Sequence, residues 1–184
     1  ANYNRTFDEK HDVGGLLMYT MQNKRSGNES DLQKSLPHRN MGLAGRFTYG
    51  YDSRYFMEFN FGLNGSERFA KKERFGFFPS GGLGWFISNE NFFPEALKKT
   101  VTKLKLKATY GLVGNDDNGS RFLYQSQWTT GWKTYTFGHT GNGLNLGGAG
   151  VYSTGNESVT WEKAKKLNIG LDLDLWKSAI HLTV

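Results

Sequence analysis

Apolar and polar side chains alternate with a period of two along most of the chain, which indicates β-strands with one apolar and one polar face. The clearest cases are residues 41–52 and residues 55–64, which are separated by the short turn Asp52-Ser53-Arg54. We therefore predict an antiparallel hairpin here. The apolar face of this hairpin consists of Leu43, Phe47, Tyr49, Tyr51, Tyr55, Met57, Phe59, Phe61 and Leu63.

The same alternation predicts further strands, about eight in all. They lie at residues 1–8, 13–23, 79–88, 103–113, 167–175 and 179–184, in addition to the hairpin. Pro79 lacks a backbone N–H, so we expect it where the hydrogen-bonded ladder is broken or bulged. The sequence PEALKKTV also predicts a short helix that begins at Pro94.

The predicted connections alternate between short and long. Tight turns are expected near Glu9-Lys10, Asp52-Ser53 and Lys177-Ser178, whereas residues 24–40, 65–75 and 114–160 form long, polar, glycine-rich connections. Short turns at one end and long loops at the other are typical of outer-membrane barrels. A soluble sandwich or a lipocalin-like barrel also alternates. Aromatic residues at the ends of the apolar faces, such as Tyr49, Tyr51 and Tyr55, favour the membrane barrel.

The amino-acid composition excludes several classes of protein and function. Glycine supplies 24 of 184 residues and aromatic residues 15%, so disorder is not expected. Cysteine is absent, which excludes disulfides and thiol nucleophiles. The net charge of +6 comes from scattered residues rather than from one basic face, which argues against nucleic-acid binding. No run of about 18 apolar residues predicts a membrane-spanning helix.

No catalytic or metal site is predicted. The four histidines, His11, His38, His139 and His181, share no metal-ligand spacing. GNDDNG at 114–119 fails the calcium-loop pattern, because glycine occupies the position of the first acidic ligand. No serine lies in a nucleophile-elbow context. We therefore expect a protein that is not an enzyme and that has no cofactor.

Four segments carry a more specific signal. They are LAGRFTYGYDSRYFMEFNFGLNGSERF (43–69), RFGFFPSGGLGWFISNENFF (74–93), LKLKATYGLVGND (104–116) and VTWEKAKKLNIGLDLDLW (159–176). This ordered series resembles the SusC-like (RagA-like) TonB-dependent outer-membrane transporters, and the resemblance covers nearly the whole chain. Because the chain begins and stops inside predicted strands, we interpret residues 1–184 as a fragment of the C-terminal half of one barrel domain, without the plug domain.

The resemblance implies an all-β, antiparallel transmembrane barrel of about 22 strands with a plugged lumen. It also implies location in the bacterial outer membrane and import of an oligosaccharide or a peptide. The implied partners are a SusD-like surface lipoprotein, the TonB–ExbB–ExbD machinery acting through the plug, and membrane lipid or lipopolysaccharide. Two alternatives stay open at this point: a soluble β-rich glycan-binding module and a self-contained small outer-membrane barrel.

Candidate site residues fall into two groups. The long connection from Asn115 to Ser158 contains Trp128, Trp132, Tyr135 and Tyr152 among amides and hydroxyls, a combination that suits stacking on sugar rings. The same side chains could instead pack within the loop or against a lid. On the polar faces, Arg46 and Glu58 are expected to face the lumen, where they would contact the plug or a substrate.

Overall fold

The computed structural model describes residues 1–27, 35–117, 119–139, 143–176 and 179–184, without the side chains of residues 132–134 and 145. Within this part β-strand is the predominant structure, and helices are few and short. The strands are β1 (Asn2–Phe7), β2 (His11–Lys24), β3 (His38–Tyr51), β4 (Tyr55–Ser66), β5 (Phe75–Phe86), β6 (Val101–Asn115), β7 (Gln127–Phe137), β8 (Leu144–Ser153), β9 (Glu162–Leu175) and β10 (Ile180–Thr183). The short helices η1 (Ile87–Asn89) and α2 (Glu95–Lys98) join β5 to β6.

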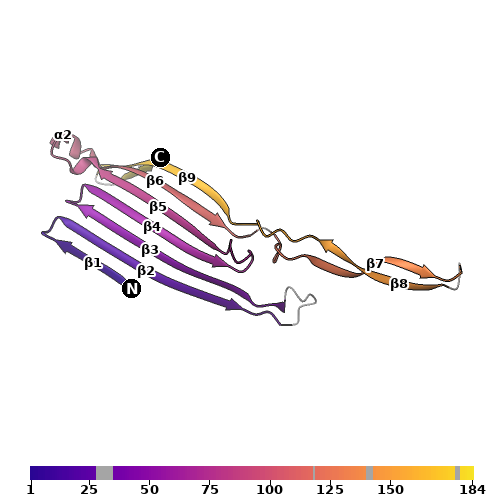
Figure 1. Ribbon diagram of the computed structural model, residues 1–184. Coiled ribbons are helices and arrows are strands. Elements are labelled where there is room, and N and C mark those ends of the chain that lie inside the picture. The colour runs from indigo at the N-terminus through magenta and orange to yellow at the C-terminus, as the bar shows by residue number, and fades with distance from the viewer. Residues whose placement is uncertain (28–34, 118, 140–142, 177–178) are drawn as a thin grey trace.

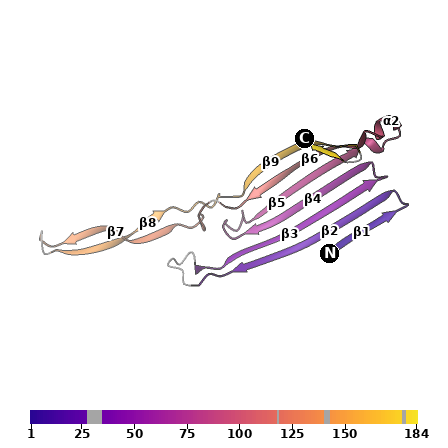
Figure 2. The same cartoon turned by 180° about the vertical axis from the view of Figure 1, so that it is seen from behind.

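Eight of these strands form one antiparallel sheet in the order β1-β2-β3-β4-β5-β6-β9-β10. Figure 1 shows the sheet with β1 along one edge, and Figure 2 shows the same arrangement from behind. The predicted strands, including the hairpin of residues 41–52 and 55–64, are confirmed, as is the short helix after Pro94. No helix in the described part of the chain is long and apolar enough to cross a membrane.

The two ends of the sheet differ. We call the end with the turns at 8–10 and 52–54 the turn end, and the opposite end the loop end. At the first turn Asp8 and Glu9 have φ of 48° and 56°, and at the second Asp52 and Ser53 have φ of 51° and 53°. Positive φ at both central residues gives a turn whose twist matches that of the paired strands. These two tight turns were predicted. The third predicted turn, near Lys177-Ser178, lies outside the described residues.

The prediction of one long loop from Asn115 to Ser158 is wrong. Within it, β7 and β8 pair as a second, two-stranded sheet. This hairpin, which we call the arm, extends beyond the loop end of the large sheet (Figure 1). The segment TTGWKTYTF is rich in threonine and aromatic residues, which favour strands, whereas the glycines around it had suggested a loop.

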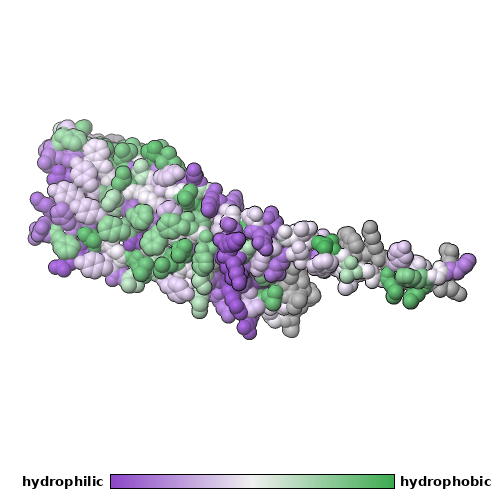
Figure 3. Space-filling model, viewed as in Figure 1, coloured by the Kyte–Doolittle hydropathy of each residue, from purple (hydrophilic) through white to green (hydrophobic). Residues whose placement is uncertain are grey.

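Direct pairing keeps like side chains together across the large sheet. Phe59 pairs with Phe47 on one side and with Gly81 on the other, while Asn60 pairs with Arg46 and Ser80. Because paired residues point to the same side of a sheet, one side is mainly apolar and the other mainly polar. We call these the apolar face and the polar face. Figure 3 shows apolar side chains gathered over the large sheet and hydrophilic ones concentrated towards the loop end.

The buried core of the described chain lies at the loop end. Phe69, Phe78 and Trp161 are at most 9% exposed and pack together, and the Trp161 indole N–H donates to the Arg74 carbonyl over 3.2 Å. The Phe78 ring occupies space that glycine leaves free, because a Cβ at Gly114 would approach it to 2.0 Å. This cluster seals the point where β5 and β6 separate.

Pro79 marks that separation. It pairs with Phe61 of β4, but the ladder between β5 and β6 begins only at the next residue, where Ser80 pairs with Gly111. Proline has no N–H to donate to a second neighbour, so a position at the end of a ladder suits it. The predicted break in the ladder at Pro79 is confirmed.

Replacement of Gly114 by alanine is expected to destabilise the protein by roughly 1–3 kcal/mol, because the new methyl group would overlap the Phe78 ring in a packed cluster. Gly15→Ala is the matched control, since a Cβ there meets no atom within 4 Å. Denaturant unfolding of the purified protein measures both. Equal stabilities for the two variants would contradict the packing described for Phe78.

Candidate functional site

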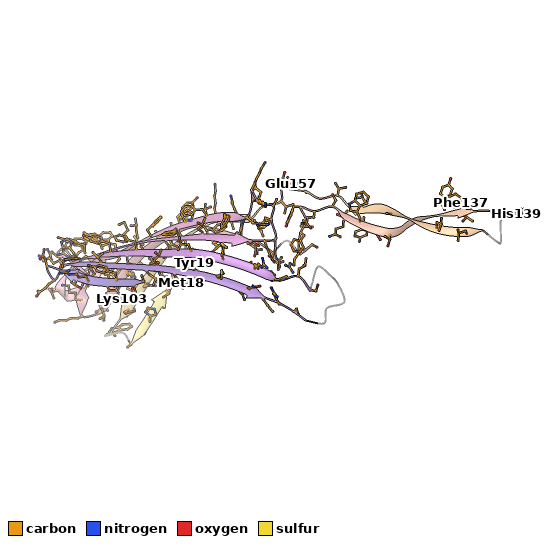
Figure 4. All side chains as sticks on the ribbon, turned by 60° about the horizontal axis from the view of Figure 1, so that its bottom comes forward. Met18, Tyr19, Lys103, Phe137, His139 and Glu157 are labelled. Carbon is orange, nitrogen blue, oxygen red and sulfur yellow. The ribbon has the colours of Figure 1, made fainter. Side chains whose placement is uncertain are left out.

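The polar face forms a hollow that runs across the sheet. Its volume is about 780 Å³, and its lining includes Asn4, Asp12, Glu58, Lys107 and Asn168, which come from β1, β2, β4, β6 and β9. Figure 4 shows the curvature that creates it: the β10 edge turns beneath the strands of the opposite edge. A concave polar surface of this kind can line a pathway or hold another polar chain.

Arg46 and Glu58 lie on this polar face, as predicted. The Arg46 Nε lies 3.5 Å from a Glu58 carboxylate oxygen and donates to the Asn60 side-chain oxygen over 3.0 Å. The Asn60 amide in turn donates to Glu58 over 2.7 Å. The side chains of Arg46 and Glu58 are 56% and 44% exposed, so the pair contributes little to stability and remains accessible to a partner. Asn60 completes the network and had not been predicted.

A second polar network occupies the β6–β9–β10 part of the same face. Lys107 Nζ lies 2.7 Å from an Asp172 carboxylate oxygen, to which the Thr183 hydroxyl donates over 3.1 Å. Beside them, His181 pairs with Asp174. Sequence reasoning missed this network, because these residues come from three strands and only the pairing of β6, β9 and β10 brings them together.

The apolar face is exposed rather than covered. Large side chains on it remain open to the surroundings, with Leu83 64%, Ile169 70% and Tyr19 62% exposed. Soluble monomeric proteins rarely present a contiguous apolar surface that crosses a whole sheet. This face therefore requires an apolar environment.

Aromatic rings form a belt along the turn end of the apolar face. Tyr51 stacks on Tyr55, and Tyr55 on Trp85, with ring centroids 6.4 and 6.5 Å apart. Phe92 meets Trp85 edge to face at 6.4 Å. Rings with polar groups are favoured at the boundary between apolar and aqueous surroundings. The belt thus marks one border of the apolar surface.

The loop-end border of the apolar surface crosses the sheet obliquely. On β2 the last large apolar residue is Met21, which successive pairs across β3 and β4 bring level with Phe75 of β5. On β9 it is Leu167, which β6 brings level with Gly81. Between β2 and β9 the border thus shifts by six residues in the direction of the strands, which is about 20 Å. Five steps between neighbouring strands separate β2 from β9, which is about 24 Å across the sheet. The strands are therefore tilted by about 40° to the normal of the apolar band.

Glu90 is the centre of a cluster at the turn end. It is 6% exposed and accepts a 2.9 Å hydrogen bond from the Trp85 indole, while Arg54 lies 3.4 Å away. Hydrogen bonds from the Tyr55 hydroxyl, from Trp85 and from Arg54 lower the pKa of Glu90, since each favours the charged carboxylate. The cluster fixes the connector between β5 and β6 against the neighbouring turn.

The loops at the opposite end are joined by arginines. Arg121 pairs with Glu67 at 2.5 Å and donates to the Pro37 carbonyl over 2.8 Å. These contacts join the connection that follows β6 to the one that follows β4 and to the one that precedes β3. Arg68 pairs with Asp117 at 2.6 Å, and this contact, with the Gly119 backbone N–H, lowers the pKa of Asp117. Asp117 of the GNDDNG segment is thus held in a loop contact.

The predicted substrate-binding aromatics lie on the arm, and the three whose side chains are described do not converge on a cavity. Trp128, Tyr135 and Tyr152 are 70%, 71% and 69% exposed. Tyr135 packs against Phe137, with ring centroids 5.4 Å apart, and Phe137 lies near the far end of the arm (Figure 4). The Trp132 side chain lies outside the described residues. The arm therefore presents separate aromatic surfaces rather than one pocket.

Comparison with known proteins agrees with this geometry. The chain is 30% identical to TonB-dependent receptor P39 of Formosa agariphila, over 100% of this chain and 19% of the receptor. It is 35% identical to TonB-dependent receptor SusC of Bacteroides thetaiotaomicron, over 70% of this chain and 12% of SusC. The chain belongs to the family of SusC-like TonB-dependent receptors. It spans less than a fifth of the length of these two relatives.

Solved structures show the same fold. The structure of the RagAB peptide transporter matches with a TM-score of 0.75 at 22% identity, over 99% of this chain and 22% of that chain. No family model matches the sequence. The interpretation as a SusC-like receptor is confirmed, and the relatives are receptors and transporters rather than enzymes.

The Glu90 cluster predicts a pH-dependent stability. A carboxylate whose pKa is lowered by folding stabilises the fold above its ordinary pKa of about 4.3, and this contribution is lost as the pH falls through the folded value. Glu90→Gln is therefore expected to lower the melting temperature at pH 7, and the gap to wild type should narrow as the pH falls below about 4. Thermal melts from pH 7 to 3 measure this.

Glu95→Gln serves as the control, because the Glu95 carboxylate is 86% exposed and pairs only with Lys98 among the described residues. It should leave the melting temperature nearly unchanged at every pH. A Glu90→Gln gap that stays constant between pH 7 and 3 would show that the carboxylate charge is not what stabilises the cluster.

Proposed function

We propose that residues 1–184 form part of the barrel wall and the extracellular loops of a transporter in the bacterial outer membrane. The observation that carries this proposal is the oblique apolar band. Its strand tilt of about 40° lies within the 35–45° range of transmembrane barrels. The family adds support, since its members are TonB-dependent receptors.

In this arrangement the two faces meet two different solvents. Lipid covers the apolar face, and the hydrogen-bonded ladder satisfies the backbone groups inside the hydrocarbon. The polar face lines the interior. The two edge strands of the described sheet, β1 and β10, do not pair with each other. We propose that further strands of the complete receptor continue the sheet on both sides and close it into a barrel of about 22 strands, to which the whole chain contributes as one domain.

Arginine substitutions on adjacent residues of β9 test the membrane assignment. Replacement of Ile169, which lies on the apolar face one two-residue step inside the border at Leu167, by arginine is expected to cost roughly 1–3 kcal/mol, between the values for the bilayer midplane and for the interface, because the charge would enter hydrocarbon. Asn168→Arg introduces the same side chain one residue earlier, on the polar face, and should cost much less. Denaturant unfolding of the receptor in lipid vesicles measures both. Similar costs for the two variants would contradict the assignment of lipid to the apolar face.

The transport function is proposed for the complete receptor. It would import an oligosaccharide or a peptide, with a SusD-like surface lipoprotein as partner and with TonB–ExbB–ExbD supplying force through a plug domain. The exposed network of Arg46, Glu58 and Asn60 supports contact with a polar chain inside the barrel, and we assign it to the plug. Trp128, Trp132, Tyr135 and Tyr152 are proposed to contact the substrate from the arm.

Uptake by intact cells tests this function. Cells that carry the receptor should accumulate labelled oligosaccharides or labelled peptides, and deletion of TonB should abolish the accumulation. If substrate contact involves the arm, Trp128→Ala and Tyr135→Ala should weaken substrate binding to the purified receptor several-fold, with Thr129→Ala as the control on the same strand. Uptake that is independent of TonB would overturn the proposed transport mechanism.

A further inference from the structure

On the apolar face of β9, the side chains change from aliphatic to positively charged towards the loop end. From the turn end upwards it carries five aliphatic side chains and then two lysines. In order, they are Leu175, Leu173, Leu171, Ile169, Leu167, Lys165 and Lys163. The lysines thus follow the last aliphatic residue directly on the same side of the sheet, at the border of the apolar band.

The two lysines are unengaged within the described chain. Both are exposed, and neither forms a hydrogen bond or an ion pair with another described residue. Their direct neighbours on β6 are Leu112 opposite Lys165 and Gly114 opposite Lys163, which offer no charge. Glu162 lies on the other face and bonds to Asn115. Both cations therefore lie on the same side of β9 as its aliphatic residues and pair with no counter-charge among the described residues.

The depth of the lysines follows from the strand tilt. Each two-residue step along a strand advances about 6.6 Å, or about 5 Å along the band normal at a tilt of about 40°. Lys165 and Lys163 hence lie about 5 and 10 Å beyond Leu167, the border of the hydrocarbon in the proposed orientation. The headgroup layer on each side of a bilayer is about 5–7 Å thick. Flexible lysine side chains at this depth reach the headgroup layer.

We propose that Lys163 and Lys165 bind the phosphate groups of a lipid in the outer leaflet of the membrane. This inference rests on the proposed function, because it takes the apolar face to be covered by lipid. A lipid is favoured over a soluble anion because the two cations continue an apolar strip of five side chains that would hold acyl chains. An anionic headgroup above that strip gives charge pairing and acyl contact to the same molecule.

A binding experiment on the full-length receptor in detergent micelles tests the proposal. The probe is lipid A with both of its phosphates, and the comparison ligand is the same lipid after enzymatic removal of its phosphates. The double variant Lys163→Ala/Lys165→Ala is expected to bind lipid A at least 10-fold more weakly, from a contribution of about 5-fold per cation. Binding of the dephosphorylated lipid should be weak and unchanged by the substitutions.

Lys166→Ala is the matched control, because it removes one lysine from the same strand but from the polar face. It should bind lipid A as wild type does. Equal weakening by the control and the double variant, or no weakening by either, would overturn the proposal. Competition by millimolar inorganic phosphate would identify a site for free anions instead of a lipid.

The outcomes separate this inference from the proposed function. A receptor that fails to insert into lipid vesicles would refute the membrane assignment itself. A receptor that inserts and supports TonB-dependent uptake, but whose double variant binds lipid A normally, would refute only the role of the two lysines. Folding of each variant is verified before binding is measured, by comparing the electrophoretic mobility of unheated and heated samples, since a folded barrel migrates differently from the heat-denatured chain.

Discussion

The register of the eight-stranded ladder is the constraint on which the other features depend. Because side chains alternate between the two faces of a strand, a slip of one residue between neighbours would move a whole set of side chains to the wrong face. The pairs Tyr49–Met57 and Met57–Leu83 keep apolar residues together from β3 to β5. Tight turns at 8–10 and 52–54 fix this register locally, since both adopt the conformation that continues the strand twist.

This register creates two surfaces with opposite requirements. An ordinary soluble domain would bury its apolar face under a second layer, whereas here the buried cluster of the described chain is the small loop-end group of Phe69, Phe78 and Trp161. The large sheet is therefore stabilised by its hydrogen-bonded ladder and, in the proposed setting, by lipid. Glycines such as Gly114 leave space for larger neighbouring side chains and allow the loop end to close over the sheet.

Charge is distributed according to the same geometry. On the polar face, Lys107 and Asp172 pair within reach of the hollow. At the turn end, Glu90 holds the connector, and at the loop end Arg121 joins separate connections. The Arg54–Glu90, Lys107–Asp172 and Arg121–Leu36 contacts join residues that lie 36, 65 and 85 positions apart in the sequence. They bind the borders of the sheet together, while its centre is held by backbone pairing.

The sequence by itself determined the strands of the large sheet, their faces and the two described tight turns, because alternation and turn propensity are local properties. It also indicated the family, through motifs that cover nearly the whole chain. Alternation broken by glycine concealed the arm, since Gly131 and Gly138 looked like loop residues in the absence of a pairing partner. Only the tertiary structure decided that Asn60 joins Arg46 and Glu58, that Lys107 meets Asp172, and that Trp128, Tyr135 and Tyr152 of the arm are largely exposed. The tilt of the apolar band also required the structure, because the border on one strand can be compared with that on another only once their register is known.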